Sequence, residues 1–284
     1  MASTATIKPR AKEAPSSPPE WSRYKFPESL YRWGGLLLAL LFLSYSIVYL
    51  NIPLERFFYM FGRVGHLIAD RYYPPDIDYV LEPDYLSSVG DTIQMAYLGA
   101  LFGMIMAVPL GWFGSYNMTP SRSVVYPVAR FFAMGARAVH ETIWAILFVT
   151  ILGFGMLAGV LALTMFCTGF AAKLFAEEIE AIDMGPVEAI RSTGASELAV
   201  MAYGVFPQVR VAFTGIGIYT WDVAFRAATV VGFFGAGGMG WYLKRNVLQI
   251  ETTRVAAILI SIIVLVLISE GVSAWARARV AKAK

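Results

Sequence analysis

Two pairs of ionisable residues stand within long apolar stretches, where an unpaired charge is costly. Asp222 and Arg226 are four residues apart, and so are Arg137 and Glu141, so each pair can share one face of a helix and form an ion pair. Arginine keeps its charge at every physiological pH, and its planar fork matches the oxygens of an oxyanion. Two roles therefore stay open for Asp222 and Arg226: a structural ion pair, or the lining of a path for an anionic substrate.

Patterns that would indicate catalysis or cofactor binding do not occur in the sequence. The two histidines, His66 and His140, are 74 positions apart, and His140-Glu141 lacks the second histidine of a zinc-protease motif. There is no G-x-x-x-x-G-K-[ST] loop to hold a nucleotide, and the single cysteine, Cys167, can form neither an intrachain disulfide nor a cysteine-based metal cluster. We therefore expect a chain that is not an enzyme and that has no metal site and no cofactor of its own.

A glycine-rich segment near the C-terminal end spells G-x-G-x-x-G, the pattern of a dinucleotide-binding loop. Its glycines are Gly235, Gly237, Gly238 and Gly240. The dinucleotide interpretation requires a preceding strand and an acidic residue about 20 positions further on. Here the segment follows a helical stretch, and the next acidic residue, Glu251, comes 11 residues after Gly240. We expect instead a turn in which the glycines allow close backbone packing at an external gate.

Composition indicates a polytopic all-α membrane protein. Apolar residues make up 57% of the 284 residues and charged residues 15%, with a mean hydropathy of +0.59. Soluble domains carry about 25% charged residues, and a β-barrel would alternate apolar and polar residues. These values exclude an ordinary soluble domain and indicate that the chain lies in a lipid bilayer. They also argue against nucleic acid as a partner.

Six spans account for the apolar stretches. The uncharged run 142–172 is too long for one span and too short for two, and the break at 153–155 divides it. Its earlier half must recruit residues 131–141, which places Arg137 and Glu141 at the cytoplasmic mouth. The expected spans are 34–50, 92–121, 131–152, 156–175, 208–234 and 255–276.

The second of these spans has two small residues on one face. Gly99 and Gly103 are four positions apart, so both face the same neighbouring helix. Without side chains they allow two backbones to approach closely. We therefore expect a helix to pack tightly against this face.

The distribution of lysine and arginine orients the spans. An even number of spans puts both termini on one side, and the segments on that side carry 16 of these residues against 6 on the other. Because positive loops stay inside, both termini are expected in the cytoplasm. The expected layout is a flexible cytoplasmic tail over 1–30 and a transmembrane domain over 31–284. Within that domain we expect an external excursion over 51–88, a cytoplasmic coupling loop over 177–207 and an external glycine-rich turn over 233–252.

The loop between the fourth and fifth expected spans carries the most specific pattern. A short helix of about two turns is expected from Pro186, Gly194 is placed to end it, and Ser196 can cap the next helix. The sequence Glu188-Ala189-Ile190 precedes Gly194, and Phe206-Pro207 follows Gly194 at 13 residues. This resembles the EAA loop of permease subunits of ATP-binding cassette (ABC) importers, with Ile190, Gly204 and Phe206 replacing an alanine, an aliphatic residue and a leucine. The resemblance implies a set of ATPase-coupling residues: Glu188, Ala189, Arg191, Gly194, Ala195, Ser196 and Pro207.

Two further segments carry a resemblance. The glycine-rich segment 235–240 resembles the Gly-Ala-Gly-Gly-aliphatic-Gly turn of the type I importer fold. Segments 221–232 and 141–149 resemble the phosphonate importer permeases, which include phosphite relatives, although His140 stands where these relatives commonly have proline. The resemblance covers about residues 30–277 and implies pathway or gate candidates: Arg137, Glu141, Trp144, Asp222, Arg226, Gly235, Gly237, Gly238 and Gly240.

The resemblance implies the type I ABC importer transmembrane fold in a bacterial cytoplasmic (inner) membrane. Two copies of the chain would form a homodimer, and two ATPase subunits would bind ATP and Mg and dock on the loops. An external substrate-binding protein would deliver phosphonate or a related phosphorus oxyanion. Alternatives are a type I permease for another small solute such as methionine, an ion-coupled secondary transporter that uses Asp222 and Arg226, and a membrane-embedded enzyme.

Overall fold

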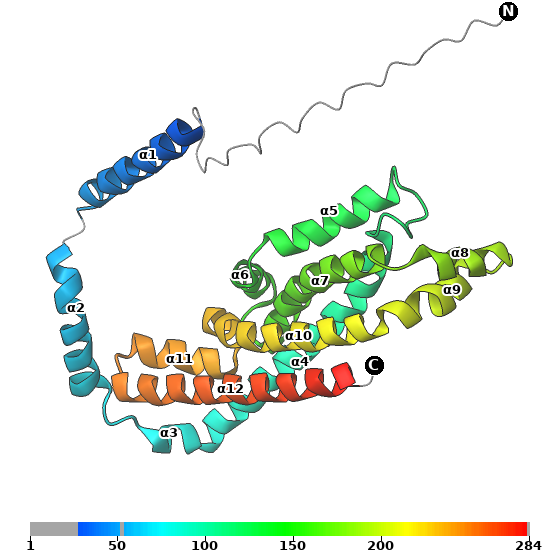
Figure 1. Cartoon of the computed structure of the whole chain (residues 1–284). Coiled ribbons are helices and arrows are strands. Elements are labelled where there is room, and N and C mark those ends of the chain that lie inside the picture. Colours follow the sequence, from blue (N-terminus) through cyan, green and yellow to red (C-terminus); the bar gives the residue numbers. More distant parts are fainter. Residues whose placement is uncertain (1–27, 52–53, 283–284) are drawn as a thin grey trace, which may run out of the picture. The chain divides into compact units, whose positions relative to one another are not determined.

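The computed structural model describes residues 28–51 and 54–282, and every regular element in these ranges is helical (Figure 1). The chain divides by its contacts into two units, residues 1–64 and 65–284. Most of the tail that we expect over residues 1–30 lies outside the described residues. Its last three residues, 28–30, are helical.

The first unit holds one long apolar helix. Helix α1 (Glu28–Tyr49) covers the first expected span, 34–50, except for its last residue, and its described side chains are exposed or half-buried within this chain. Helix α2 (Leu54–Leu67) begins in this unit and is amphipathic.

The second unit holds the remaining elements. The π-helical turn η1 (Ile68–Tyr72) and the short helix α3 (Ile77–Leu81) precede the long helix α4 (Pro83–Phe113). The other elements of this unit are α5 (Val125–Ala138), α6 (Glu141–Leu152), α7 (Met156–Glu180), α8 (Met184–Ser192), α9 (Glu197–Val200), η2 (Met201–Val205), α10 (Phe206–Val231), η3 (Gly232–Ala236), α11 (Gly238–Leu248) and α12 (Thr252–Lys282).

The described residues contain five helices that are long and apolar enough to cross a membrane, or six if the bent pair α5 and α6 counts as one span. The number of candidate membrane helices therefore confirms the predicted all-α membrane fold with about six spans. The expected break at 153–155 is also confirmed, because α6 ends at Leu152 and α7 begins at Met156.

The bounds of the second expected span, 92–121, are wrong. Helix α4 begins at Pro83, with proline in its first turn, so the last residues of the expected excursion 51–88 already belong to it. The helix continues through Asp84 and Asp91, because a charged residue ends an apolar run but does not end a helix. It stops at Phe113, and a turn region follows up to residue 124.

A straight third span is also wrong. Helices α5 and α6 are bent by 89° at Val139 and His140, which both have extended backbones. The His140 ring accepts a hydrogen bond from the Thr142 amide and so caps α6 as the start of a new helix. The bend separates Arg137 from Glu141, and the Glu141 carboxylate instead lies 3.3 Å from the His140 ring. The expected Arg137–Glu141 pair therefore does not form.

Helices α4 and α7 form the centre of the second unit. Gly99, Gly103 and Gly111 repeat on one face of α4, and a Cβ atom at these positions would overlap the side chains of Leu163, Cys167 and Phe175 on α7. The Thr168 hydroxyl donates a hydrogen bond to the Gly103 carbonyl across the same contact, at 3.4 Å. The close packing expected at Gly99 and Gly103 is therefore confirmed. Helix α10 packs against both helices, and α12 packs against α10 (Figure 1).

We expect Gly103→Ala to lower the free energy of unfolding by about 1–3 kcal/mol. The new Cβ would overlap that of Cys167 and would lie 3.1 Å from the Thr164 carbonyl oxygen, so the two backbones must move apart. Gly90→Ala on the same helix is the matched control, because a Cβ at Gly90 meets nothing within 4 Å. Thermal unfolding of the purified chain in detergent compares the two, and equal melting temperatures would contradict the packing argument.

Candidate coupling segment and translocation pathway

The candidate coupling segment, between α7 and α10, contains the short helices α8 and α9 and the π-helical turn η2, and short helices are what the sequence predicts there. Helix α8 begins at Met184, two residues before Pro186, because the Asp183 carboxylate accepts a hydrogen bond from the Gly185 amide and caps the helix there. Gly194 follows the helix with a φ of +78°, a left-handed conformation that favours glycine. Ser196 caps α9 by accepting a hydrogen bond from the Ala199 amide. The helix-ending role of Gly194 and the capping role of Ser196 are confirmed.

Helix α8 has one buried and one exposed face. Val187 is fully buried in a cluster with Ile179 of α7, Val200 of α9 and Val205 of η2, which fixes the helix to the end of α7 and to the segment before α10. Gly204 lies under this contact, because a Cβ there would be 3.3 Å from the Val187 Cα atom. Three of the expected coupling residues, Glu188, Ala189 and Arg191, are exposed on α8, and Gly194 is exposed just after it. Of the others, Ala195 is half-buried and Ser196 and Pro207 are exposed.

The segment is held together by two polar contacts, which local sequence signals do not indicate. Arg191 forms an ion pair with Glu197 at 3.1 Å and so joins α8 to α9. The Gln208 side chain accepts a hydrogen bond from the Asp183 amide at 3.0 Å and donates one to the Asp183 carbonyl at 3.1 Å. The start of α8 is thereby attached to the first turns of α10.

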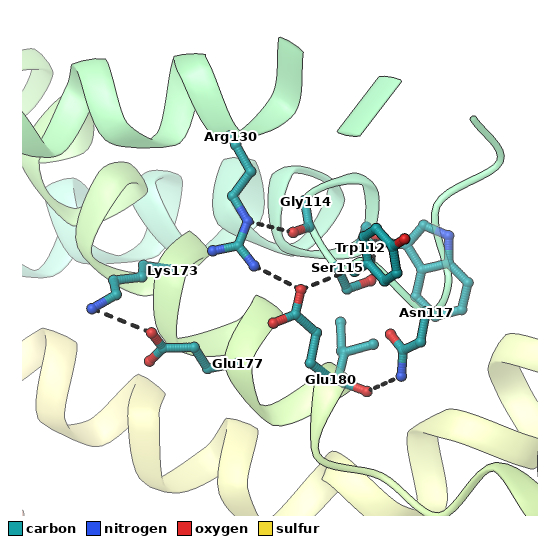
Figure 2. A network of polar contacts seen from close by, with 10 residues as sticks. Trp112, Gly114, Ser115, Asn117, Arg130, Lys173, Glu177 and Glu180 are labelled. Carbon is teal, nitrogen blue, oxygen red and sulfur yellow. Dashed lines mark hydrogen bonds and ion pairs between the residues drawn. The ribbon is translucent and has the colours of Figure 1, made fainter. Parts of the chain in front are cut away.

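A polar network joins the end of α7 to α5 and to the end of α4 (Figure 2). The Glu180 carboxylate accepts hydrogen bonds from Arg130 at 2.7 Å and from the Tyr116 amide at 2.8 Å. Arg130 also donates to the Gly114 carbonyl at 2.7 Å, and Asn117 donates to the Ile179 carbonyl at 2.8 Å. Glu180 ends α7 three residues before the cap of α8, so this network lies at the base of the coupling segment.

The expected ion pair in α10 is present. Arg226 donates to the Asp222 carboxylate at 2.8 Å. The two side chains differ in burial, because that of Asp222 is 6% exposed and that of Arg226 is 50% exposed. Asp222 therefore holds a guanidinium group that remains open to the surface of this chain.

Of the remaining pathway candidates, Trp144 lies near the same helix and Arg137 does not. Trp144 on α6 stacks on Phe148 and packs against the core cluster that includes Phe225 of α10. Its indole nitrogen donates a hydrogen bond to the Ala136 carbonyl at 3.1 Å, which joins the two arms of the bend between α5 and α6. Arg137 lies at the last turn of α5, apart from this cluster.

The glycine-rich turn joins three parts of the second unit. Gly235, Gly237 and Gly238 have positive φ values of 111°, 92° and 63°, so the chain can leave η3 and begin α11 within a few residues. The Thr92 hydroxyl of α4 accepts a hydrogen bond from the Met239 amide at 2.9 Å, and the Gly155 amide donates to the Gly235 carbonyl at 3.2 Å. The segment follows a helix and opens no strand-to-helix unit, so the geometry is that of a packing turn.

These features define the class of the protein: an all-α membrane permease with the fold of type I ABC importer transmembrane subunits. The methionine ABC transporter MetNI in an inward-facing conformation matches with a TM-score of 0.58 and 18% identity, over 69% of this chain and 95% of that chain. An amino acid ABC transporter solved with histidines matches with a TM-score of 0.57 and 20% identity, over 72% of this chain and 98% of that chain. These likenesses establish the fold.

The chain belongs to the family of binding-protein-dependent transport system inner membrane components, whose model matches residues 99–282. The phosphite transport system permease protein PtxC of Stutzerimonas stutzeri is 36% identical over 206 residues, 72% of this chain and 74% of the relative. The phosphate-import permease protein PhnE of Mycolicibacterium smegmatis is 34% identical over 254 residues, which are 89% of this chain. The chain spans about half, 47%, of the length of that mycobacterial relative. The family predicted from the coupling-loop and flanking motifs is confirmed, and it is a family of transport components.

Proposed function

We propose that the chain is the membrane-spanning permease subunit of an ATP-driven importer for phosphonate or a related phosphorus oxyanion. The observation that carries the choice of substrate class is the 36% identity to a phosphite permease over 72% of this chain. The half-exposed Arg226 is chemically consistent with it, because a guanidinium group binds the oxygens of such anions in a forked geometry. Similarity to methionine and amino acid transporters supports the fold and gives no preference for those solutes.

The proposed assembly contains two copies of the chain, two ATPase subunits that bind ATP and Mg, and an external substrate-binding protein. The exposed face of α8 is the proposed docking surface for an ATPase subunit. Closure of the ATPase pair would push on α8 and shift the spans between inward-open and outward-open arrangements. Two contacts support this route: buried Val187 fixes α8 to the end of α7 and to η2, which leads into α10, and Glu180 joins the end of α7 to α5.

The proposed location is the bacterial cytoplasmic membrane, with both termini and the coupling loop 177–207 in the cytoplasm and the segment 233–252 outside. The excess of positive residues on the side of the termini supports this orientation. Leu198 is 73% exposed on α9 and gives a reporter position. Labelling of a Leu198→Cys variant by a membrane-impermeant reagent in intact cells would contradict the orientation.

The substrate class is tested with the complex reconstituted in lipid nanodiscs with its ATPase and binding protein. We expect ATP hydrolysis to rise when the binding protein is supplied with phosphonate, phosphite or phosphate, and to stay at its basal rate with methionine. Omitting the binding protein is the control, because stimulation must then disappear. Stimulation by methionine and by none of the phosphorus oxyanions would overturn the proposed substrate class while leaving the family unchanged.

A further inference from the structure

A small cavity lies between the end of α4, the helix α5 and the middle of α7. Its volume is about 160 Å³, and its walls are mostly small and apolar side chains together with Gly114. Three charged residues line it, and all three are positive: Arg130 and Arg137 from α5 and Lys173 from α7. The cavity is apart from the Asp222–Arg226 pair and from the exposed face of α8.

The positive charge in this cavity is only partly balanced. Arg130 pairs with Glu180 at 2.7 Å and Lys173 pairs with Glu177 at 3.2 Å, as Figure 2 shows, but neither carboxylate lines the cavity. Arg137 makes no hydrogen bond or ion pair through its side chain within residues 28–51 and 54–282. Three cations therefore face one cavity whose lining contains no carboxylate.

The backbone that carries Arg137 is fixed in place. Gly169 on α7 lies directly under it, since a Cβ at Gly169 would be 2.5 Å from the Arg137 backbone nitrogen. The Ala136 carbonyl beside it is held by the indole of Trp144. Only the side chain of Arg137 is free to turn, which suits a residue that closes over a ligand.

We propose that this cavity binds a phosphate group, held by Arg137 together with Arg130 and Lys173. A doubly charged tetrahedral oxyanion offers enough oxygens for three cations, and arginine binds such oxygens in pairs. The cavity, at about 160 Å³, has room for several waters and so for a small tetrahedral anion. The phosphate can come from an anionic lipid headgroup or from a free phosphate anion, and both sources present the same chemistry to the cavity.

A bound phosphate would act on the base of the coupling segment. Arg130 is shared between the cavity and the Glu180 network, and a ligand that bridges Arg137 of α5 and Lys173 of α7 would hold α5 against α7 beside that network. The site is thus separate in its role from solute permeation, and it would make the stability of the cytoplasmic end of the bundle depend on phosphate. It does not depend on which solute the importer carries.

The test uses the full-length chain in nanodiscs and measures the melting temperature in two arms. In the first arm inorganic phosphate is added at constant ionic strength to nanodiscs of neutral phosphatidylcholine. In the second arm phosphatidylglycerol is included and no phosphate is added. We expect the melting temperature of the wild-type chain to rise by about 2–4 °C in at least one arm. A rise in the first arm identifies a free anion, and a rise in the second identifies a lipid headgroup.

Two variants separate this site from a general effect of positive charge. Arg137→Gln should melt at the wild-type temperature without phosphate, because its side chain has no partner among the described residues, and should lose most of the rise. Arg137→Lys should keep part of the rise. Arg210→Gln removes an exposed arginine from a different helix, α10, and should keep the whole rise in melting temperature. The proposal is overturned if the wild type shows no rise in either arm, or if Arg137→Gln and Arg210→Gln respond alike. Transport is not the readout, so such a failure would leave the proposed function standing.

Discussion

Glu188→Lys and Gly194→Arg are each expected to reduce uptake by roughly 100-fold or more, with a normal amount of the chain in the membrane. Glu188 lies on the exposed face of α8, so a reversed charge there acts on the docking surface and not on the core. Gly194 has open space around it but a φ of +78°, so an arginine strains the turn between α8 and α9 by about 1–2 kcal/mol and adds a bulky cation beside the same surface.

Controls for these two variants follow from the same geometry. Glu82→Lys makes the same charge change at an exposed position just before α4, outside the coupling loop 177–207, and should transport normally. Gly194→Asn keeps a residue that tolerates the left-handed conformation and should retain most of the uptake. Uptake in cells, membrane content and co-purification of the ATPase are the measurements. Normal ATPase association and substrate-stimulated turnover in both Glu188→Lys and Gly194→Arg would refute the coupling role.

The short helices of the coupling segment could be predicted because their signals are local. A capping serine and a glycine with positive φ act within one turn of helix, so Ser196 and Gly194 can be identified from neighbouring residues alone. The Glu180 network could not be predicted. Its partners Arg130 and Glu180 are 50 residues apart, and only the packing of α5 on α7 brings them together.

The number of membrane spans could be predicted from the sequence more reliably than the residues at which each span begins and ends. Uncharged runs report where a chain is apolar, whereas α4 continues past Asp84 and Asp91 because a helix requires only backbone hydrogen bonds and compatible residues. The bend at His140 shows the opposite error. An i,i+4 spacing predicts a pair only where the helix is continuous, and a histidine that caps a new helix removes the Arg137–Glu141 pair.

The second large expected effect comes from substitutions in the Asp222–Arg226 pair, first from the single variants. Arg226→Ala leaves the Asp222 carboxylate buried, at 4% exposure for the whole residue, without its cation. We expect this variant to lose about 3–5 kcal/mol of stability, since a buried charge is left unpaired. Asp222→Asn should lose less, because the remaining guanidinium group is half exposed and can be hydrated. Thermal unfolding in nanodiscs measures both.

The double variant Asp222→Asn with Arg226→Gln separates a structural role from a role in the pathway. Removing both charges together leaves no unpaired ion, so we expect the double variant to recover most of the stability that Arg226→Ala loses. We also expect uptake of a phosphorus oxyanion to fall by at least about 10-fold, because a charge that is half exposed on a spanning helix has to face water or a partner rather than lipid. The matched control removes a half-buried pair on other elements, Asp76→Asn with Arg254→Gln, whose ion pair at 3.3 Å should contribute about 1 kcal/mol or less. If the double variant in α10 folds, binds its ATPase and transports at the wild-type rate, the pathway role is wrong and Asp222 and Arg226 form a structural pair alone.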